Sequence, residues 1–168
     1  MIWEFGKKLK NPSDLDTIES EWGVLLPKKL KDIVIEHDHA SPPNNRNIFK
    51  TKLGDERCFG GFCYFNLEES GNVISDYNAI RNRLPDKVFP FAEDPGGNFI
   101  CLDYKVLNVA GEPQVVFWNH EYKIEGLESG EETYETVVVS ASFEEFLNNL
   151  YGRETNEDFD LSEFEVFD

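Results

Sequence analysis

The sequence predicts an α+β fold, in which a single domain holds a twisted, mostly antiparallel sheet flanked by helices. Apolar residues keep helical spacing near both ends of the chain, while the middle carries strand-like segments joined by short turns. Strands and helices do not alternate regularly, so a parallel sheet of βαβ units is not expected. A chain of 168 residues is long enough to bury a core without disulfides.

Two short helices are expected near the N-terminus. Ser13 is a candidate N-cap for the first, acidic residues follow in its first turn, and Gly23 ends it. Pro27 lies near the first position of the second helix. Residues 72–84 form a third candidate, because their apolar residues keep helical spacing. A last helix begins after Ser142, which is followed by acidic residues.

Five segments have the composition of strands. The first two are expected to pair around a turn at Gly54 and Asp55. Residues 40–47, rich in Pro and Asn, are expected to form a loop. The strand candidates are residues 48–53, 57–65, 99–104, 114–119 and 134–140.

Asp94-Pro95-Gly96-Gly97 has the composition of a type II turn. Pro fits the second position and Gly96 fits the third, which requires a positive φ. Gly97 is expected to allow a close backbone approach as the next strand begins. A phosphate-binding loop is a poor alternative, because Glu93 and Asp94 carry the wrong charge and no Lys follows.

Neither catalysis, nor a cofactor, nor a metal site is expected from the sequence. Glu93, Asp94 and Asp103 do not supply the closely spaced oxygen ligands of a calcium loop. Asp103 is expected to be a partly buried hydrogen-bond acceptor, and an enzyme using it is the least favoured function. Residues 37–39 (His-Asp-His) are interpreted as a helix C-terminal cap. Three cysteines without zinc spacing are expected to be core thiols: Cys58, Cys63 and Cys101.

The net charge of −17 is concentrated in the second half of the chain. Residues 1–84 hold 12 Lys/Arg and 13 Asp/Glu, whereas residues 85–168 hold 4 and 20. Such a field opposes nucleic acids and anionic membranes and attracts a basic partner. An acidic surface that only aids solubility is the alternative. The N-terminus does not resemble a signal peptide and no apolar segment is long enough to span a membrane, so a cytoplasmic location is expected.

Six short segments occur in a telling order: Ile18-Glu19, Leu26-Pro27, Phe91-Ala92-Glu93-Asp94 with Gly96-Gly97, Leu102-Asp103, Val115-Val116-Phe117-Trp118-Asn119-His120, and Ser142-Phe143-Glu144-Glu145-Phe146-Leu147. Together they resemble the SUKH superfamily, whose best-known branch is the Smi/Knr type. The resemblance covers residues 15–151 and departs from the family at 37–47, where a short Asn-Gly-Gly-type turn is usual. We therefore expect a SUKH-like domain over 1–152 and an acidic C-terminal tail over 153–168.

The resemblance implies a twisted sheet and no established catalysis. Many bacterial members are immunity proteins, which bind and neutralise a cognate toxin, often a nuclease, and fungal relatives are regulatory scaffolds. Because nucleases carry basic grooves for phosphates, the acidic half of the chain favours a basic, nuclease-type toxin as the partner. A non-catalytic scaffold that binds a cellular protein is the alternative.

The partner-binding residues are expected mainly in the polar segment that follows the Trp118 strand. Its acidic residues are candidates for contacts with a basic surface, and its two tyrosines for aromatic anchors. A solvated hairpin is the alternative for this segment, and the tail offers a second candidate contact. The candidates are Glu121, Tyr122, Glu125, Glu128, Glu131, Glu132 and Tyr134, together with Glu93 and Asp94.

Overall fold

A computed structural model describes residues 1–123 and 134–153. The helices are α1 (Asp14–Trp22), α2 (Lys28–Glu36), α3 (Val73–Ile80) and α4 (Phe143–Asn148), with 3₁₀ turns at Asn44–Arg46 and Arg81–Arg83. The strands are β1 (Ile48–Lys50), β2 (Glu56–Cys58), β3 (Gly61–Phe62), β4 (Val88–Glu93), β5 (Phe99–Leu107), β6 (Pro113–Lys123) and β7 (Tyr134–Ser140).

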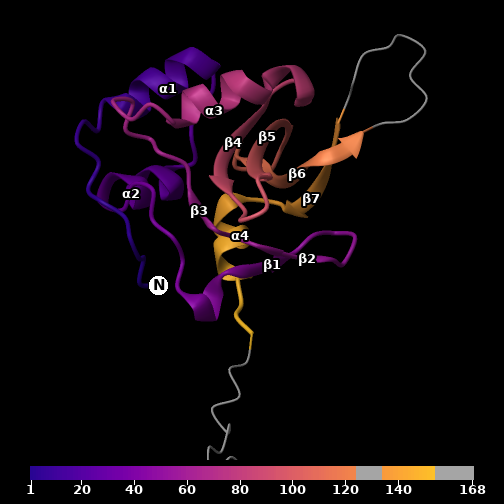
Figure 1. Cartoon of the computed structure of the whole chain (residues 1–168). Coiled ribbons are helices and arrows are strands. Elements are labelled where there is room, and N and C mark those ends of the chain that lie inside the picture. Colours follow the sequence, from indigo (N-terminus) through magenta and orange to yellow (C-terminus); the bar gives the residue numbers. More distant parts are fainter. Residues whose placement is uncertain (124–133, 154–168) are drawn as a thin grey trace, which may run out of the picture.

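The main sheet has five antiparallel strands in the order β3-β4-β5-β6-β7. Strands β1 and β2 pair as a separate antiparallel ribbon, which lies below the larger sheet in Figure 1. The ribbon contacts the main sheet through a backbone hydrogen bond from Lys52 N to Val138 O and through the packing of Phe49 on Phe117. The predicted α+β fold with a twisted, mostly antiparallel sheet is confirmed.

One face of the sheet packs against α1, α2 and α4. Ile18, Leu30 and Phe146 from these helices share one buried cluster with Ile100 and Phe117 of the sheet. Each of the five side chains is at most 1% exposed. Removal of this apolar surface from water is the main stabilising contribution to the fold.

A smaller buried cluster covers the opposite face. It includes Cys101 and Trp118 from the sheet and Ile80 from the end of α3. The Trp118 indole donates a hydrogen bond of 3.1 Å to the backbone oxygen of Arg83, so its polar atom is satisfied although the ring is 1% exposed. Trp118 is therefore a core residue.

Of the two predicted serine N-caps one forms a capping hydrogen bond, and Asn72, which was not predicted as a cap, forms another. Asn72 precedes α3 and accepts a hydrogen bond from Ser75 N, and Ser142 does the same for α4 from Glu145 N. Ser13 precedes α1, but its side chain makes no capping hydrogen bond. Gly23 ends α1 with a φ of 68°, the left-handed conformation that glycine adopts readily.

One strand prediction is wrong, and one strand was not predicted. Residues 57–65 do not form one strand, because β2 pairs with β1 whereas β3 pairs with β4 of the main sheet. Gly60 and Gly61 lie where the chain passes between the sheets, and a Cβ on Gly60 would lie 3.0 Å from Glu93 O. Strand β4 was not predicted, since Pro90 cannot donate to a strand ladder; the β4–β5 register shifts directly after it.

The interpretation of residues 37–39 as a helix cap is also wrong for two of the three residues. Asp38 is 5% exposed and accepts hydrogen bonds from Phe65 N and Asn66 N. The ring of His39 stacks on Tyr64 with ring centroids 3.6 Å apart. Both residues therefore attach the segment after α2 to the chain that follows β3.

Candidate partner-binding surface

The turn between β4 and β5 is organised by the Asp94 carboxylate. Oδ1 accepts hydrogen bonds from Gly96 N (2.9 Å) and Asn98 N (2.8 Å), and Oδ2 accepts one from Asn98 Nδ2 (3.0 Å). The positive φ of 81° belongs to Gly97, so the predicted type II turn, which needs it at Gly96, is wrong. A Cβ on Gly97 would meet nothing within 4 Å, so the expected close backbone approach is absent there.

This turn geometry predicts that two neighbouring substitutions differ in how much they lower the free energy of unfolding. Gly97→Ala is expected to lower the free energy of unfolding by about 1–2 kcal/mol, because alanine is strained at this φ. Gly96→Ala is the matched control and is expected to cost less, since its Cβ meets its nearest neighbour, Asn98 Nδ2, at an ordinary 3.4 Å. Urea denaturation of both variants measures the difference. If Gly96→Ala were the less stable variant, the result would instead support a type II turn with the positive φ at Gly96.

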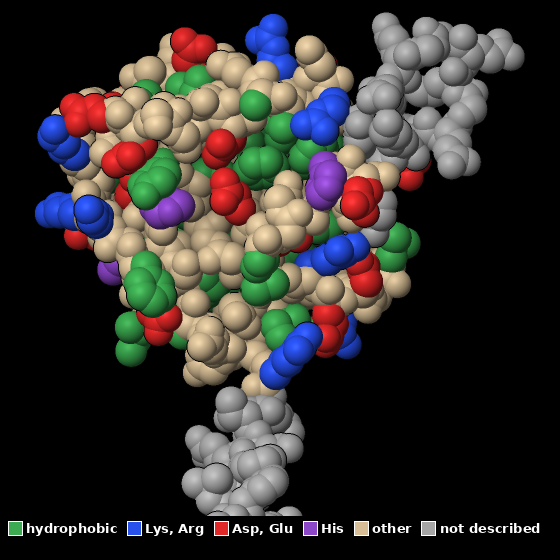
Figure 2. Space-filling model, viewed as in Figure 1, with side chains coloured by type: hydrophobic (Ala, Val, Ile, Leu, Met, Phe, Trp, Pro, Cys, Tyr) green, Lys and Arg blue, Asp and Glu red, His purple; other side chains and the backbone are tan. Residues whose placement is uncertain are grey.

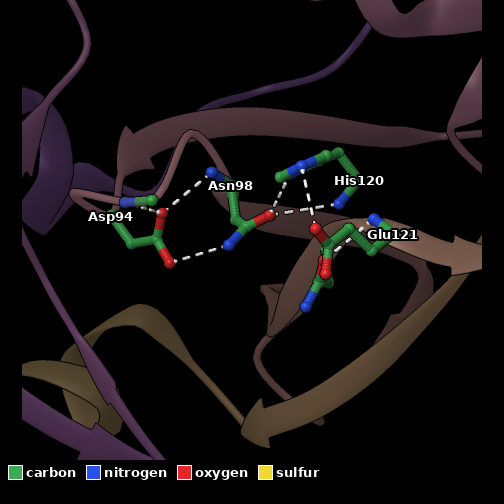
Figure 3. A network of polar contacts seen from close by, with 6 residues as sticks. Asp94, Asn98, His120 and Glu121 are labelled. Atoms are coloured by element: carbon green, nitrogen blue, oxygen red, sulfur yellow. Dashed lines mark hydrogen bonds and ion pairs between the residues drawn. The ribbon is translucent and has the colours of Figure 1, made fainter.

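Asn98 connects this turn to the end of β6. Its side chain is buried, and its Oδ1 accepts from His120 N (3.1 Å) while lying 2.6 Å from His120 Nδ1. Because an amide oxygen only accepts, Nδ1 carries the proton. The other ring nitrogen, Nε2, lies 3.8 Å from Glu121 Oε1. Asp94, Asn98, His120 and Glu121 thus form a continuous row across the end of the sheet (Figure 3).

A shallow cavity of about 290 Å³ lies beside this row. Glu93 reaches it from the last position of β4, where it is paired with Gly61 on one side and Phe99 on the other. The ring of His39 is held at the cavity by its stacking on Tyr64 and by a 3.0 Å contact from Nδ1 to Phe62 O. The lining residues are His39, Ser41, Gly60, Gly61, Phe62, Glu93, Asp94 and Pro95.

The electrostatics of this end of the sheet are dominated by uncompensated carboxylates. Within residues 1–123 and 134–153, no Lys or Arg forms an ion pair with Glu93, Asp94 or Asp76. Burial, followed by repulsion from Glu93, raises the pKa of Asp76 to about 6. Figure 2 shows Asp and Glu side chains in the middle of this face, while most visible Lys and Arg lie nearer its outline.

The structure brings together some of the predicted partner-binding residues. Glu93, Asp94 and Glu121 lie at one end of the sheet, and the last of them has a side chain that is 77% exposed. Tyr122 lies in β6 and Tyr134 lies in β7. Tyr134 pairs with Lys123 where these two strands meet. The remaining candidates lie outside the described residues: Glu125, Glu128, Glu131 and Glu132.

Sequence reasoning missed the residues that hold this surface in place. The hydrogen bond between His120 and Asn98 joins residues that are 22 positions apart in the sequence. A contact over such a sequence separation cannot be detected from a local motif. Asp103, by contrast, behaves as predicted: it is 3% exposed and accepts from Lys105 N and Gln114 Nε2. None of the described helices has the length and hydropathy required to cross a membrane.

Comparison with known proteins identifies the family. Residues 11–149 match the SMI1 / KNR4 family (SUKH-1). The chain belongs to this family. The whole surface described above, from His39 to Glu121, lies within the matched SUKH-1 region. The earlier resemblance to the SUKH superfamily is confirmed.

A curated relative also matches this SUKH-1 chain. It is the SPbeta prophage-derived uncharacterized protein YokK of Bacillus subtilis (strain 168), which is 26% identical over 140 residues. The match covers 83% of this chain and 66% of the relative, so the chain spans slightly less than two thirds of the relative's length.

Proposed function

We propose that the protein is an immunity protein that binds and neutralises a cognate, basic toxin of the nuclease type in the cytoplasm. It acts by stoichiometric binding and not by catalysis. The observation that carries the proposal is the acidic end of the main sheet, where Glu93, Asp94 and Glu121 are presented without a described Lys or Arg in an ion pair with them. Membership of the SUKH-1 family, whose members are often immunity proteins, supports it.

The geometry suits a protein interface because the Asp94 carboxylate and the backbone at Glu121 are held in place before a partner arrives. Asp94 is fixed by three hydrogen bonds, and the backbone around Glu121 is fixed by Asn119 Oδ1, which accepts from Glu121 N at 2.9 Å. Prearranged charges lose less conformational entropy on binding than mobile ones. They also speed association with an oppositely charged partner and help to exclude wrong partners.

The described ends of β6 and β7 flank an acidic segment of the sequence, residues 124–133. It leaves β6 after Lys123 and rejoins the sheet at Tyr134, at the same end as the β4–β5 turn. The triple substitution Glu128→Lys, Glu131→Lys and Glu132→Lys is expected to slow association with the toxin about tenfold or more at low salt, while folding stays nearly intact. Surface plasmon resonance at two salt concentrations gives the association rate.

A matched control separates local contact from total charge. Glu4→Lys, Glu21→Lys and Glu36→Lys change the net charge equally but place it on exposed residues of the N-terminal part. We expect this variant to associate faster than the loop variant. If both variants associated equally slowly, the effect of the acidic segment would come from total charge and not from local contact. If neither rate changed, the segment would be a solvated surface that does not contact the partner.

The partner itself is identified by a pull-down with the full chain as bait, followed by mass spectrometry. The expected result is one stoichiometric partner with a basic domain, which is toxic when expressed alone and harmless with this chain. Several unrelated housekeeping proteins, or partners without toxicity, would favour a regulatory scaffold instead.

A further inference from the structure

Three potential metal ligands meet next to the cavity, although they are far apart in the sequence. Cys63 follows β3, Asp76 lies in α3, and Glu93 ends β4. One ligand atom from each residue, a sulfur and two carboxylate oxygens, lies within 4.8 Å of the others. The backbone hydrogen bond from Cys63 N to Phe91 O (3.0 Å) and the β3–β4 ladder hold Cys63 and Glu93 in fixed relation.

Asp76 shows that this cluster lacks a positive charge. Its Oδ2 is fully shielded from solvent and has no hydrogen-bond partner among the residues the structure describes. A buried carboxylate oxygen without a donor is costly, and here a second carboxylate, Glu93, adds repulsion. A hydrogen bond from the Cys63 thiol and a weaker charge interaction with His39 favour the charged Asp76 but do not outweigh burial and the repulsion from Glu93. A bound cation would satisfy the free oxygen and offset the repulsion together.

We propose that Cys63, Asp76 and Glu93 bind a divalent transition-metal ion, with Zn²⁺ as the best fit. A thiolate is a soft ligand that Mg²⁺ and Ca²⁺ disfavour, whereas Zn²⁺ accepts sulfur and carboxylate oxygen together. Three protein ligands leave a fourth tetrahedral position open. Of the three ligands, Glu93 lines the cavity of about 290 Å³, and water is the fourth ligand that we expect.

Metal binding at this site is accompanied by the release of one proton, from the Cys63 thiol. Cys63 is 1% exposed, and burial holds the pKa of its thiol well above the ordinary value, so the metal-free protein keeps the thiol protonated. Binding therefore replaces the thiol proton with the metal and releases that proton to solvent. The two carboxylates and the thiolate together carry three negative charges against the two positive charges of the ion.

The experiment uses the full, reduced chain after treatment with EDTA and removal of the chelator. Calorimetric titration with Zn²⁺ is expected to show one site per chain, and Zn²⁺ is expected to raise the melting temperature where Mg²⁺ does not. Titration with Co²⁺ as a spectroscopic probe is expected to give a thiolate-to-cobalt charge-transfer band in the near ultraviolet. Calorimetry in buffers of different ionisation enthalpy counts the released protons.

Matched variants distinguish this site from weak binding to the acidic surface. Glu93→Gln is expected to weaken Zn²⁺ binding roughly tenfold or more, and Cys63→Ser to remove the cobalt band. The controls are Glu121→Gln, an exposed carboxylate, and Cys58→Ser, a thiol outside the cluster; both are expected to bind as the original chain does.

The proposal is overturned if no stoichiometric Zn²⁺ binding occurs, or if Glu93→Gln binds as tightly as Glu121→Gln. It is equally overturned if the cobalt band depends on Cys58 and not on Cys63. Glu93 is half-buried at a strand end, so its variant remains a valid test even if Cys63→Ser fails to fold. The outcome does not depend on whether the partner is a toxin.

Discussion

Phe146→Ala is expected to lower the free energy of unfolding by about 3–5 kcal/mol, the usual cost of truncating a buried aromatic side chain. Phe146 is 1% exposed and lies where α4, the β1–β2 ribbon and the main sheet meet. Its loss leaves a cavity that rigid aromatic neighbours cannot fill, since its ring contacts four others with centroids 5.5–6.4 Å away: Phe49, Phe59, Phe91 and Phe143.

Urea denaturation followed by circular dichroism measures this loss. Phe5→Ala is the matched control, because it deletes the same ring from a side chain that is 87% exposed. We expect the control to change stability by no more than about 0.5 kcal/mol. Because domains are stable by only about 5–15 kcal/mol, this loss is a large share of the total stability. Similar midpoints for the two variants would contradict this packing arrangement.

Asp38→Ala is expected to cost about 2–4 kcal/mol, because it removes the acceptors of two backbone donors at once. Phe65 N donates to Oδ1 at 2.7 Å and Asn66 N donates to Oδ2 at 3.1 Å. Each donor left unsatisfied in a buried position costs about 1–3 kcal/mol. Asp32→Ala is the control: its exposed pair with Lys28 contributes at most about 0.5 kcal/mol. Equal costs for the two variants would contradict the role given to Asp38.

The same residue gives a pH dependence with a definite sign. Burial raises the pKa of Asp38 above its ordinary value of 3.8, although hydrogen bonds from Phe65 and Asn66 partly offset this. The folded state therefore holds this proton more tightly than the unfolded state. The resulting stabilisation is complete below about pH 3.8 and is lost as the pH rises through the raised pKa. Asp38→Asn has no such proton.

Unfolding of the original chain and Asp38→Asn across this pH range isolates the effect. The free energy of unfolding of the original chain minus that of Asp38→Asn is expected to fall as the pH rises above 3.8 and then to level off. A difference that rises with pH would mean that the hydrogen bonds outweigh burial and that the pKa of Asp38 is lowered.

Local signals predicted the helices well, because their caps and apolar spacing are written within ten residues or so. Ser142 and Gly23 illustrate this. The strands were harder, since a strand is defined by its partner. Pro90 obscured β4, and the Gly60-Gly61 pair hid the point at which the chain leaves one sheet for another.

The candidate surface was predictable in charge but not in construction. The acidic character of Glu93, Asp94 and Glu121 is visible in the sequence, whereas the hydrogen bonds through Asn98 form only when β5 and β6 pair. The Cys63–Asp76–Glu93 cluster gathers residues from three elements. Metal-ligand motifs report ligands that share a loop or helix, so this arrangement leaves no spacing pattern to detect.

The main sheet is buried on both faces, by α1, α2 and α4 on one side and by the Ile80–Trp118 cluster on the other. The partner-binding surface proposed above lies at the strand ends, at the β4–β5 turn and the end of β6. Changes of charge or length in these turns leave the interior packing untouched. If the proposed interface lies at these turns, their side chains can change its charge while the buried core that supports them stays the same.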